Sequence, residues 1–281
     1  MSLAGHVSRA VTRALLPAAQ RERLAGLQLR DAGHGWDRLG MHPDSVKLSA
    51  ATTRFLYDVW FRVDSRGAEH VPSTGPAILA ANHAGLLPLD GMMLWADVLR
   101  QTSPPRVARM VADTFVPRLP FVGTAFSRSG VVGGTRGTVD RLLDDGELLG
   151  IFPEGVPGIA KPFAERYQLR PFRVGHAELA IQHGAPIVPV GIIGSEEQWP
   201  ELARIESFHA WGAPYLPIPA TPIPLPVRYR IRYGAPIDPR GRFSARQADD
   251  PAAARTLARE VQAAVQALVD EGLRERKGIF R

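Results

Sequence analysis

Short apolar runs alternate with helical patterns through the middle of this chain, and the alternation limits its possible folds more than any other feature. The apolar runs occupy residues 77–81, 107–111, 148–152 and 186–193. Apolar spacing predicts helices between them, over residues 91–100, 138–143 and 172–183. Strand–helix–strand alternation of this kind predicts an α/β fold with a mostly parallel sheet flanked by helices.

The N-terminal part of the chain carries amphipathic helical patterns. Apolar residues recur along one side of residues 3–30, arginines lie on the other, and Pro17 is expected to interrupt this helix. A second helix is predicted over 45–60, with Asp44 or Ser45 as its N-cap. Amphipathic helices of this kind either pack on the body of a protein or dock on a membrane surface.

The C-terminal end is predicted to be a long helix over residues 250–276, with apolar residues on one face. Because the chain has no internal repeat and no long low-complexity linker, we expect one domain with additions at its ends. The expected parts are membrane-docking helices over 1–60, an α/β core over 61–240, and a C-terminal helix over 245–281 that packs on the core.

Residues 199–226 interrupt the alternation. They include Trp199, Phe208, Trp211 and Tyr215 together with seven prolines. Proline at this density disfavours helix and central strand, so we expect an apolar loop, either packed on the body or laid into a membrane interface. Residues 227–233 alternate strictly, which predicts a strand near a sheet edge with one face in water.

The overall composition excludes several classes of protein. Cysteine is absent, which removes disulfides, thiolate metal sites and a cysteine nucleophile. No apolar run reaches the ~18 residues of a membrane span, and the N-terminus lacks the pattern of a signal peptide. The net charge of +6 suits an anionic partner, such as an anionic membrane or a phosphorylated substrate. No nucleic-acid-binding motif accompanies this charge, so we expect no nucleic-acid partner.

The strongest local motif runs from Asn82 to Asp90. It follows an apolar run and precedes a predicted helix, so it lies where open α/β sheets bind their ligands. Asp90 could accept a hydrogen bond from one nitrogen of His83 and leave the other nitrogen free to take a proton. The spacing by itself fits a helix-capping or buried histidine equally well.

Two further motifs follow along the chain. The first is Phe152-Pro153-Glu154-Gly155, in which proline and glycine force a turn that presents Glu154 at the same end of the sheet. Glu154 could bind acceptor hydroxyls, or it could hold the loop by accepting hydrogen bonds from backbone N–H groups. The second contains Pro186, Ile187, Val188 and Pro189, whose apolar character suits either the wall of an acyl pocket or the start or edge of a strand.

Taken in order, these motifs resemble those of the glycerolipid (lysophospholipid) acyltransferase superfamily, and 1-acylglycerol-3-phosphate acyltransferases in particular. The resemblance extends from about residue 61 to residue 236. It implies transfer of a fatty acyl group from acyl-CoA or acyl carrier protein, as co-substrate, to a hydroxyl of a glycerolipid. His83 then acts as general base and Asp90 orients it, with no metal and no further cofactor. Expected acceptors are lysophospholipids such as lysophosphatidate, or mono- and diacylglycerols.

The resemblance also implies a set of substrate contacts, which here are Asn82, Phe152, Pro153, Glu154 and Gly155. The chain departs from the family pattern in two places. Six residues separate His83 from Asp90, where the family has four, and no Thr/Ser-Arg follows Gly155. Lys161, Arg128 and Arg136 are therefore the candidates for phosphate or CoA contacts.

Other functions find less support in the sequence. No Gly-x-Ser-x-Gly, Gly-x-Gly-x-x-Gly or P-loop motif occurs, and no close histidine pair accompanies the acidic residues. The alternative from another class is a non-catalytic protein of the same fold that binds lipid or docks on a membrane, in which His83 has no role. We expect an intracellular enzyme, held peripherally on the cytoplasmic face of a membrane.

Overall fold

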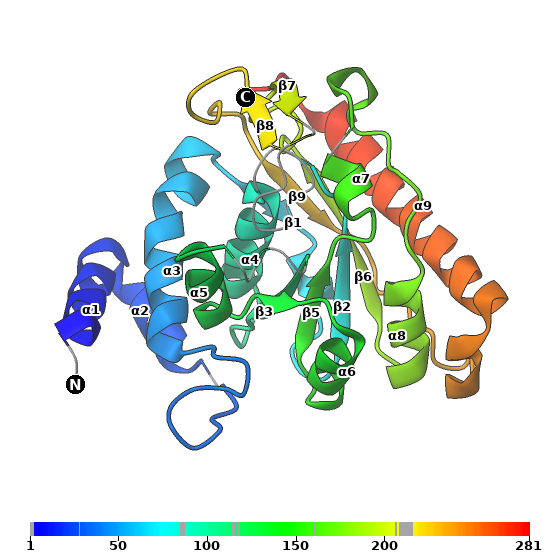
Figure 1. The fold of residues 1–281 in the computed structure, drawn as a ribbon, viewed down its shortest axis with the longest axis horizontal. Helices are drawn as coiled ribbons and strands as arrows, with labels where there is room; N and C mark the ends of the chain where they lie inside the picture. Colours follow the sequence, from blue (N-terminus) through cyan, green and yellow to red (C-terminus); the bar gives the residue numbers. More distant parts are fainter. Residues whose placement is uncertain are drawn as a thin grey trace.

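A computed structural model of the chain describes residues 3–27, 29–84, 88–113, 116, 119–159, 161–205, 207 and 216–281. Within these residues a seven-stranded sheet lies between two layers of helices, and a two-stranded sheet lies beside its upper end (Figure 1). The predicted α/β architecture is confirmed. None of the helices formed by these residues has both the length and the hydropathy needed to cross a bilayer.

The large sheet is mostly parallel. Its strands are β1 Asp64–Arg66, β2 Ala77–Ala81, β3 Ala108–Ala112, β4 Val132–Gly133, β5 Leu148–Ile151, β6 Ile187–Ile193 and β9 Arg230–Tyr233. Their order is β1-β9-β6-β2-β5-β3-β4, and every neighbouring pair is parallel except β6 and β9. The small antiparallel sheet consists of β7 Glu201–Ile205 and β8 Leu216–Pro219.

The helices lie on both faces of this sheet. They are α1 Leu3–Leu15, α2 Ala18–Ala25, α3 Pro43–Phe55, α4 Leu89–Gln101, α5 Val122–Arg128, α6 Arg136–Asp144, α7 Val156–Ile159, α8 Gly175–His183 and α9 Pro251–Glu275. Helices α3 and α4 pack on one face, while α6, α8 and α9 pack on the other (Figure 1). The helix predicted over 250–276 therefore corresponds to α9, which lies against β6. The division of the chain at residues 60 and 240 stays a prediction.

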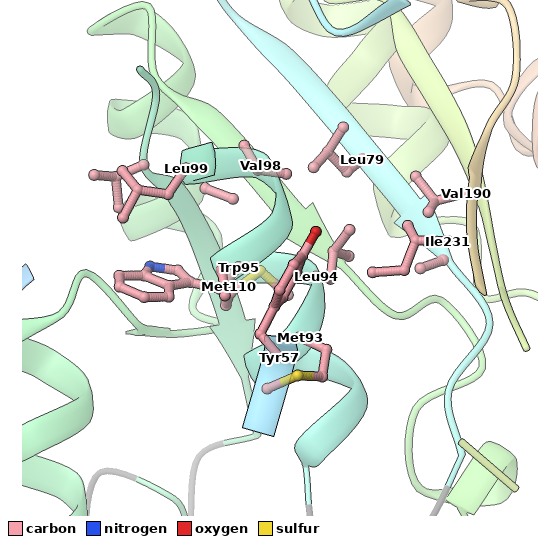
Figure 2. Packing of buried hydrophobic residues seen from close by; sticks show 14 of the residues in the cluster. Tyr57, Leu79, Met93, Leu94, Trp95, Val98, Leu99, Met110, Val190 and Ile231 are labelled. Carbon is pink, nitrogen blue, oxygen red and sulfur yellow. The ribbon is translucent and has the colours of Figure 1, made fainter. Parts of the chain in front are cut away.

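Alternation along the buried strands builds two hydrophobic cores. In β2, Leu79 faces the α3–α4 side and Ile78 faces the α6–α8–α9 side, because successive side chains point to opposite faces of a sheet. Figure 2 shows the first core, in which Leu79 and Val190 of the sheet lie against α4 residues such as Leu94. Burial on both faces explains why these strands appear in the sequence as continuous apolar runs.

A buried carboxylate connects the N-terminal helices to the sheet. Asp97 of α4 accepts hydrogen bonds from the hydroxyls of Tyr57, Ser65 (2.8 Å) and Tyr233 (2.6 Å). Burial is the main cause that raises the pKa of Asp97, and the three hydrogen bonds oppose it. Since Tyr57 lies in the π-helical turn Leu56–Trp60 after α3, Asp97 joins that turn to β1 and β9.

The N-terminal helices confirm one detail of the prediction and correct another. The helix over the first residues does break at Pro17, between α1 and α2. The predicted N-cap of α3 is wrong, because the helix begins at Pro43 and the side chain of His42 caps it. His42 Nδ1 accepts a hydrogen bond from Asp44 N–H at 3.1 Å. Proline at the first helical position has no N–H to satisfy, so the cap serves the next residue.

Strand β9 is buried on both faces, so the predicted water-facing side is wrong. Arg230 and Arg232 are buried because each finds a partner beyond the strand. Arg232 Nη2 contacts Asp64 at 2.8 Å and Glu275 of α9 at 3.0 Å, and Arg230 Nη2 donates to the carbonyl of Arg281 at 2.6 Å. Buried arginines need such partners, and the alternating pattern could not show them.

The expected loop over residues 199–226 is also corrected, since β7 and β8 form within it. Pro219 pairs with Glu201, next to a register irregularity. A strand of a two-stranded sheet has one free edge, so a proline without an N–H is tolerated there. Trp199 packs on the first core and its Nε1 donates to the carbonyl of Thr221 at 2.7 Å. The predicted interfacial residues Phe208, Trp211 and Tyr215 lie outside the described residues.

Candidate active site

His83 and Asp90 form a hydrogen-bonded pair at the carboxyl end of β2. His83 lies two residues after the end of β2, and Asp90 is the second residue of α4. His83 Nδ1 lies 2.7 Å from Asp90 Oδ2. The imidazole is 17% exposed, whereas the carboxylate is fully buried. Six intervening residues therefore allow the predicted contact, although residues 85–87 lie outside the described part of the chain.

The surroundings of Asp90 determine which imidazole nitrogen carries a proton. Asp90 Oδ2 also accepts from Ala84 N–H at 2.9 Å, and Oδ1 accepts from Gly91 N–H at 2.7 Å. Both oxygens of Asp90 thus accept backbone N–H groups, and a carboxylate group of this kind acts only as a hydrogen-bond acceptor. Nδ1 of His83 must therefore donate. In the neutral ring Nε2 then has a free lone pair that can accept a proton.

Phe152 fixes the orientation of the imidazole from another side. Its ring stacks on that of His83, with centroids 4.3 Å apart and planes 24° from parallel. A Cβ atom at Gly91 would lie 3.4 Å from the Phe152 ring, so the ring packs close to the first turn of α4.

Glu154 holds the main chain at His83. Its Oε1 accepts from His83 N–H at 3.0 Å, and its Oε2 accepts from Arg170 N–H at 2.7 Å. The side chain is fully buried, so the predicted direct contact with substrate hydroxyls is not available to it. The geometry matches the second interpretation of the sequence, in which Glu154 holds the loop by accepting hydrogen bonds from backbone N–H groups. Glu154 therefore contacts the main chain of His83 and of Arg170.

Lys161 is buried behind Glu154. Its ammonium lies 3.4 Å from Glu154 Oε2 and 3.1 Å from Glu196 Oε1, and its side chain is 2% exposed. Burial raises the pKa of Glu196, and the charge of Lys161 opposes that rise. The predicted phosphate contact is contradicted, because this cation is enclosed between two carboxylates and is not presented to a ligand.

We expect Lys161→Met to lower the free energy of unfolding by about 3 kcal/mol, because it leaves two buried carboxylates without a counter-charge. Urea unfolding followed by circular dichroism measures the change. The matched control is Lys277→Met, which removes an exposed ammonium and should alter stability by no more than about 0.5 kcal/mol. Equal stability of the two variants would show that the Glu154–Lys161–Glu196 cluster contributes nothing to folding.

The two candidate arginines lie apart from this cluster. Both are exposed. The guanidinium of Arg128 lies 5.5 Å from the ring of Trp36, and that of Arg136 contacts Glu178 at 3.3 Å. In the described part of the chain, neither guanidinium forms a hydrogen bond with His83. Their roles as phosphate or CoA contacts stay predictions.

Asn82 links β2 to β6 and is not placed to bind substrate. Its side chain is fully buried, and its Nδ2 donates to the carbonyl of Ile192 at 2.9 Å while its Oδ1 accepts from Ile192 N–H at 2.7 Å. Both of these hydrogen bonds are with the backbone of the neighbouring strand β6. The predicted substrate contact is therefore wrong, and Asn82 instead connects β2 to β6 next to His83.

The predicted acyl-pocket residues belong to the protein core. Ile187 and Val188 are fully buried in β6, one in each hydrophobic cluster. Pro189 lies inside this central strand, although prolines usually occur at edges or bulges. The ladder to β9 is interrupted there, between Val190–Tyr233 and an isolated Ile187–Ile237 bridge, so the missing N–H is tolerated. Pro186 precedes the strand and is half-buried.

The structure adds Arg173, which the sequence analysis missed. Its N–H donates to the carbonyl of Pro153 at 3.0 Å. Its guanidinium lies against Gly155, which has a φ of +60°. The apolar pattern had placed residues 172–183 in a helix, but α8 starts only at Gly175 and leaves Arg173 in the preceding loop. The predicted helix included Arg173, so the sequence offered no separate signal for it.

A sequence model of the family described as Acyltransferase matches residues 62–193, which contain His83, Asp90 and Glu154. An uncharacterized protein of Mycobacterium tuberculosis is 36% identical over 92% of this chain and 74% of its own length. A human protein named "DGAT1/2-independent enzyme synthesizing storage lipids" is 30% identical over 81% of this chain and 67% of its own length.

The fold is also similar to a solved structure. The 1-acyl-sn-glycerophosphate acyltransferase PlsC from Thermotoga maritima superposes with a TM-score of 0.58 and 19% identity, over 92% of this chain and 89% of that one. At that identity the likeness concerns the fold. The match to the family model and the identity to relatives along most of their length agree with it, and the chain belongs to the acyltransferase family.

Proposed function

We propose that this protein transfers a fatty acyl group from a thioester, acyl-CoA or acyl carrier protein, to a hydroxyl of a glycerolipid. The observation that carries the proposal is the partly exposed imidazole of His83, whose Nδ1 is bonded to Asp90. The names of the human relative and of the Thermotoga structure, one a storage-lipid enzyme and the other a lysophosphatidate acyltransferase, support a glycerolipid acceptor.

His83 Nε2 takes the proton of the acceptor hydroxyl while the oxygen attacks the thioester carbonyl. The tetrahedral intermediate then collapses and the C–S bond breaks. The departing thiolate recovers the proton from the imidazolium, so the enzyme returns to its starting state. Asp90 stabilises the charged ring, and neither a covalent intermediate nor a further cofactor is required.

The remaining motif residues support this reaction in different ways. Phe152 holds the ring of His83, and the buried Glu154 holds its backbone. Pro153 and Gly155 lie in the turn after β5, where Gly155 N–H donates to the carbonyl of Phe152 at 3.0 Å. Asn82 fixes the end of β2 against β6.

We further propose that the enzyme works at the cytoplasmic face of a membrane. Four apolar side chains that are 44–58% exposed form an apolar docking face, which consists of Leu15, Phe55, Val59 and Ile223. Two contacts hold its parts together. Arg54 Nη1 donates to the carbonyl of Leu15 at 3.0 Å, and Trp60 Nε1 donates to that of Pro224 at 3.2 Å. Exposed apolar groups on neighbouring elements favour insertion into a lipid interface.

Replacing Phe55 and Val59 together by aspartate should weaken binding to anionic phospholipid vesicles by about tenfold or more, because two inserted apolar groups are lost and charge is added. Vesicle flotation measures the bound fraction. The matched control is Ala263→Asp with Ala267→Asp, which adds the same charge to exposed positions of α9, on the opposite face of the sheet. Equal binding by both double variants would contradict the apolar docking face.

The function itself is tested with the wild-type protein. Radiolabelled long-chain acyl-CoA is incubated with lysophosphatidate, other lysophospholipids, monoacylglycerol and diacylglycerol, and the labelled lipid product identifies the acceptor. If no acceptor is labelled, the assay is repeated with acyl carrier protein as donor. Absence of transfer from both donors would contradict the proposal and favour the lipid-binding alternative.

A further inference from the structure

Arg173 lies beside the turn that positions His83. Its backbone N–H donates to the carbonyl of Pro153 at 3.0 Å, so the loop before α8 is attached to the turn after β5. The next residue along that turn, Glu154, accepts the N–H of His83 at 3.0 Å. Arg173 is thus linked to the main chain of His83 through two hydrogen bonds, one at Pro153 and one at Glu154.

The guanidinium of Arg173 lies flat against the backbone of Gly155. A Cβ atom at Gly155 would be 3.1 Å from Cζ, 3.2 Å from Nη1 and 3.3 Å from Nη2. Three nearly equal distances mean that the glycine faces the plane of the guanidinium and not its edge. The N–H groups, which project in the plane, are therefore left free to bind a ligand.

Neighbouring cations are neutralised, but Arg173 is not. Lys161 is enclosed by two carboxylates, and Arg170 contacts Glu165 at 2.5 Å. Within the described residues, no hydrogen bond or ion pair reaches the exposed guanidinium of Arg173. His176, one turn further on, is neutral near pH 7, because burial lowers its pKa to about 4.

We propose that Arg173 binds a phosphate group of one of the substrates and so determines substrate specificity. This inference deepens the proposed function and rests on it. A planar guanidinium with free N–H groups matches the geometry of phosphate oxygens and can bind two of them at once. The phosphate belongs either to the lipid acceptor or to CoA, and these two sources are distinguished by experiment.

The test compares four substrate pairs. The acceptor is lysophosphatidate or monoacylglycerol, and the donor is acyl-CoA or the acyl thioester of N-acetylcysteamine, which carries no phosphate. We expect Arg173→Ala to raise KM by about tenfold to a hundredfold for the substrate whose phosphate it binds, with a smaller effect on kcat. Arg173→Lys, which keeps the charge and loses the planar fork, should restore only part of the loss. The matched control is Arg259→Ala, which removes an exposed arginine of α9.

The substrate pairs in which KM rises identify the phosphate. A rise in KM with lysophosphatidate, whichever donor is used, assigns Arg173 to the acceptor. A rise in KM with acyl-CoA, whichever acceptor is used, assigns it to CoA. An equal rise in the pair without phosphate, or no rise in any pair, would overturn the proposal.

Equilibrium binding separates this inference from the proposed function. Calorimetry measures the affinity of wild type and Arg173→Ala for CoA and for glycerol 3-phosphate, and it requires no turnover. If wild type transfers nothing but loses affinity on Arg173→Ala, the phosphate site stands and the acyl-transfer proposal fails. If wild type binds neither ligand and transfers nothing, the phosphate site is refuted as well.

Discussion

The variant His83→Ala is expected to lower kcat of acyl transfer by about a thousandfold, within the range that general-base groups contribute. The change removes the nitrogen that, in the proposed mechanism, takes the acceptor proton. It leaves the backbone N–H of residue 83, which Glu154 binds, so the turn keeps its main contact. Initial rates of labelled product under saturating donor and acceptor measure the effect.

The control for this variant is His34→Ala, which removes an exposed imidazole from the loop before α3. It should keep the wild-type rate. Circular dichroism and the thermal midpoint establish that both variants are folded. A folded His83→Ala that retains wild-type activity would mean that the imidazole is not the base.

The second large effect is expected for Asp90→Asn, with a fall in kcat of about a hundredfold to ten-thousandfold. Asp90 accepts three hydrogen bonds, from His83 Nδ1, Ala84 N–H and Gly91 N–H. Asparagine places an NH₂ group where one oxygen was, so one of these donors faces another donor. If the imidazole moves its own proton to Nε2 in response, it can no longer act as a base.

Asp97→Asn is the matched control, since Asp97 is equally buried and lies two turns along the same helix. Its three partners are hydroxyls, and a hydroxyl can rotate to accept from an NH₂ group as well as to donate. This variant should lose stability but keep kcat per folded molecule. Similar falls in kcat for both variants would show that the Asp90 effect is a general consequence of disturbing α4.

The fold was predictable because its main determinant is local. Apolar runs that are buried on both faces, separated by helical spacing, indicate a parallel sheet covered by helices. The order of the motifs was informative for a similar reason. His83 and Glu154 each follow a strand, and parallel strands bring their carboxyl ends to the same edge.

What could not be predicted depends on partners that are remote in the sequence. Lys161 carries an ammonium group of the kind that binds phosphate, and only the position of Glu196 in the fold shows that this ammonium is enclosed. Arg232 belongs to an alternating strand, and only α9 supplies the Glu275 that lets it be buried. Arg173 was missed because apolar spacing extended a helix three residues too far, which hid a loop cation near the reacting groups.

The position of β9 has a consequence for how the protein is made. β1 forms its ladder with β9, where Asp64 pairs with Arg230, so the first strand of the sheet in sequence cannot pair until the last one has been synthesised. Until residue 233 leaves the ribosome, β6 has an open edge beside a hydrophobic surface, and such edges favour association between nascent chains. The contact that closes the sheet is also among its most distant in sequence, which slows folding. A cell that makes this protein therefore has reason to shield it with chaperones until translation is nearly complete.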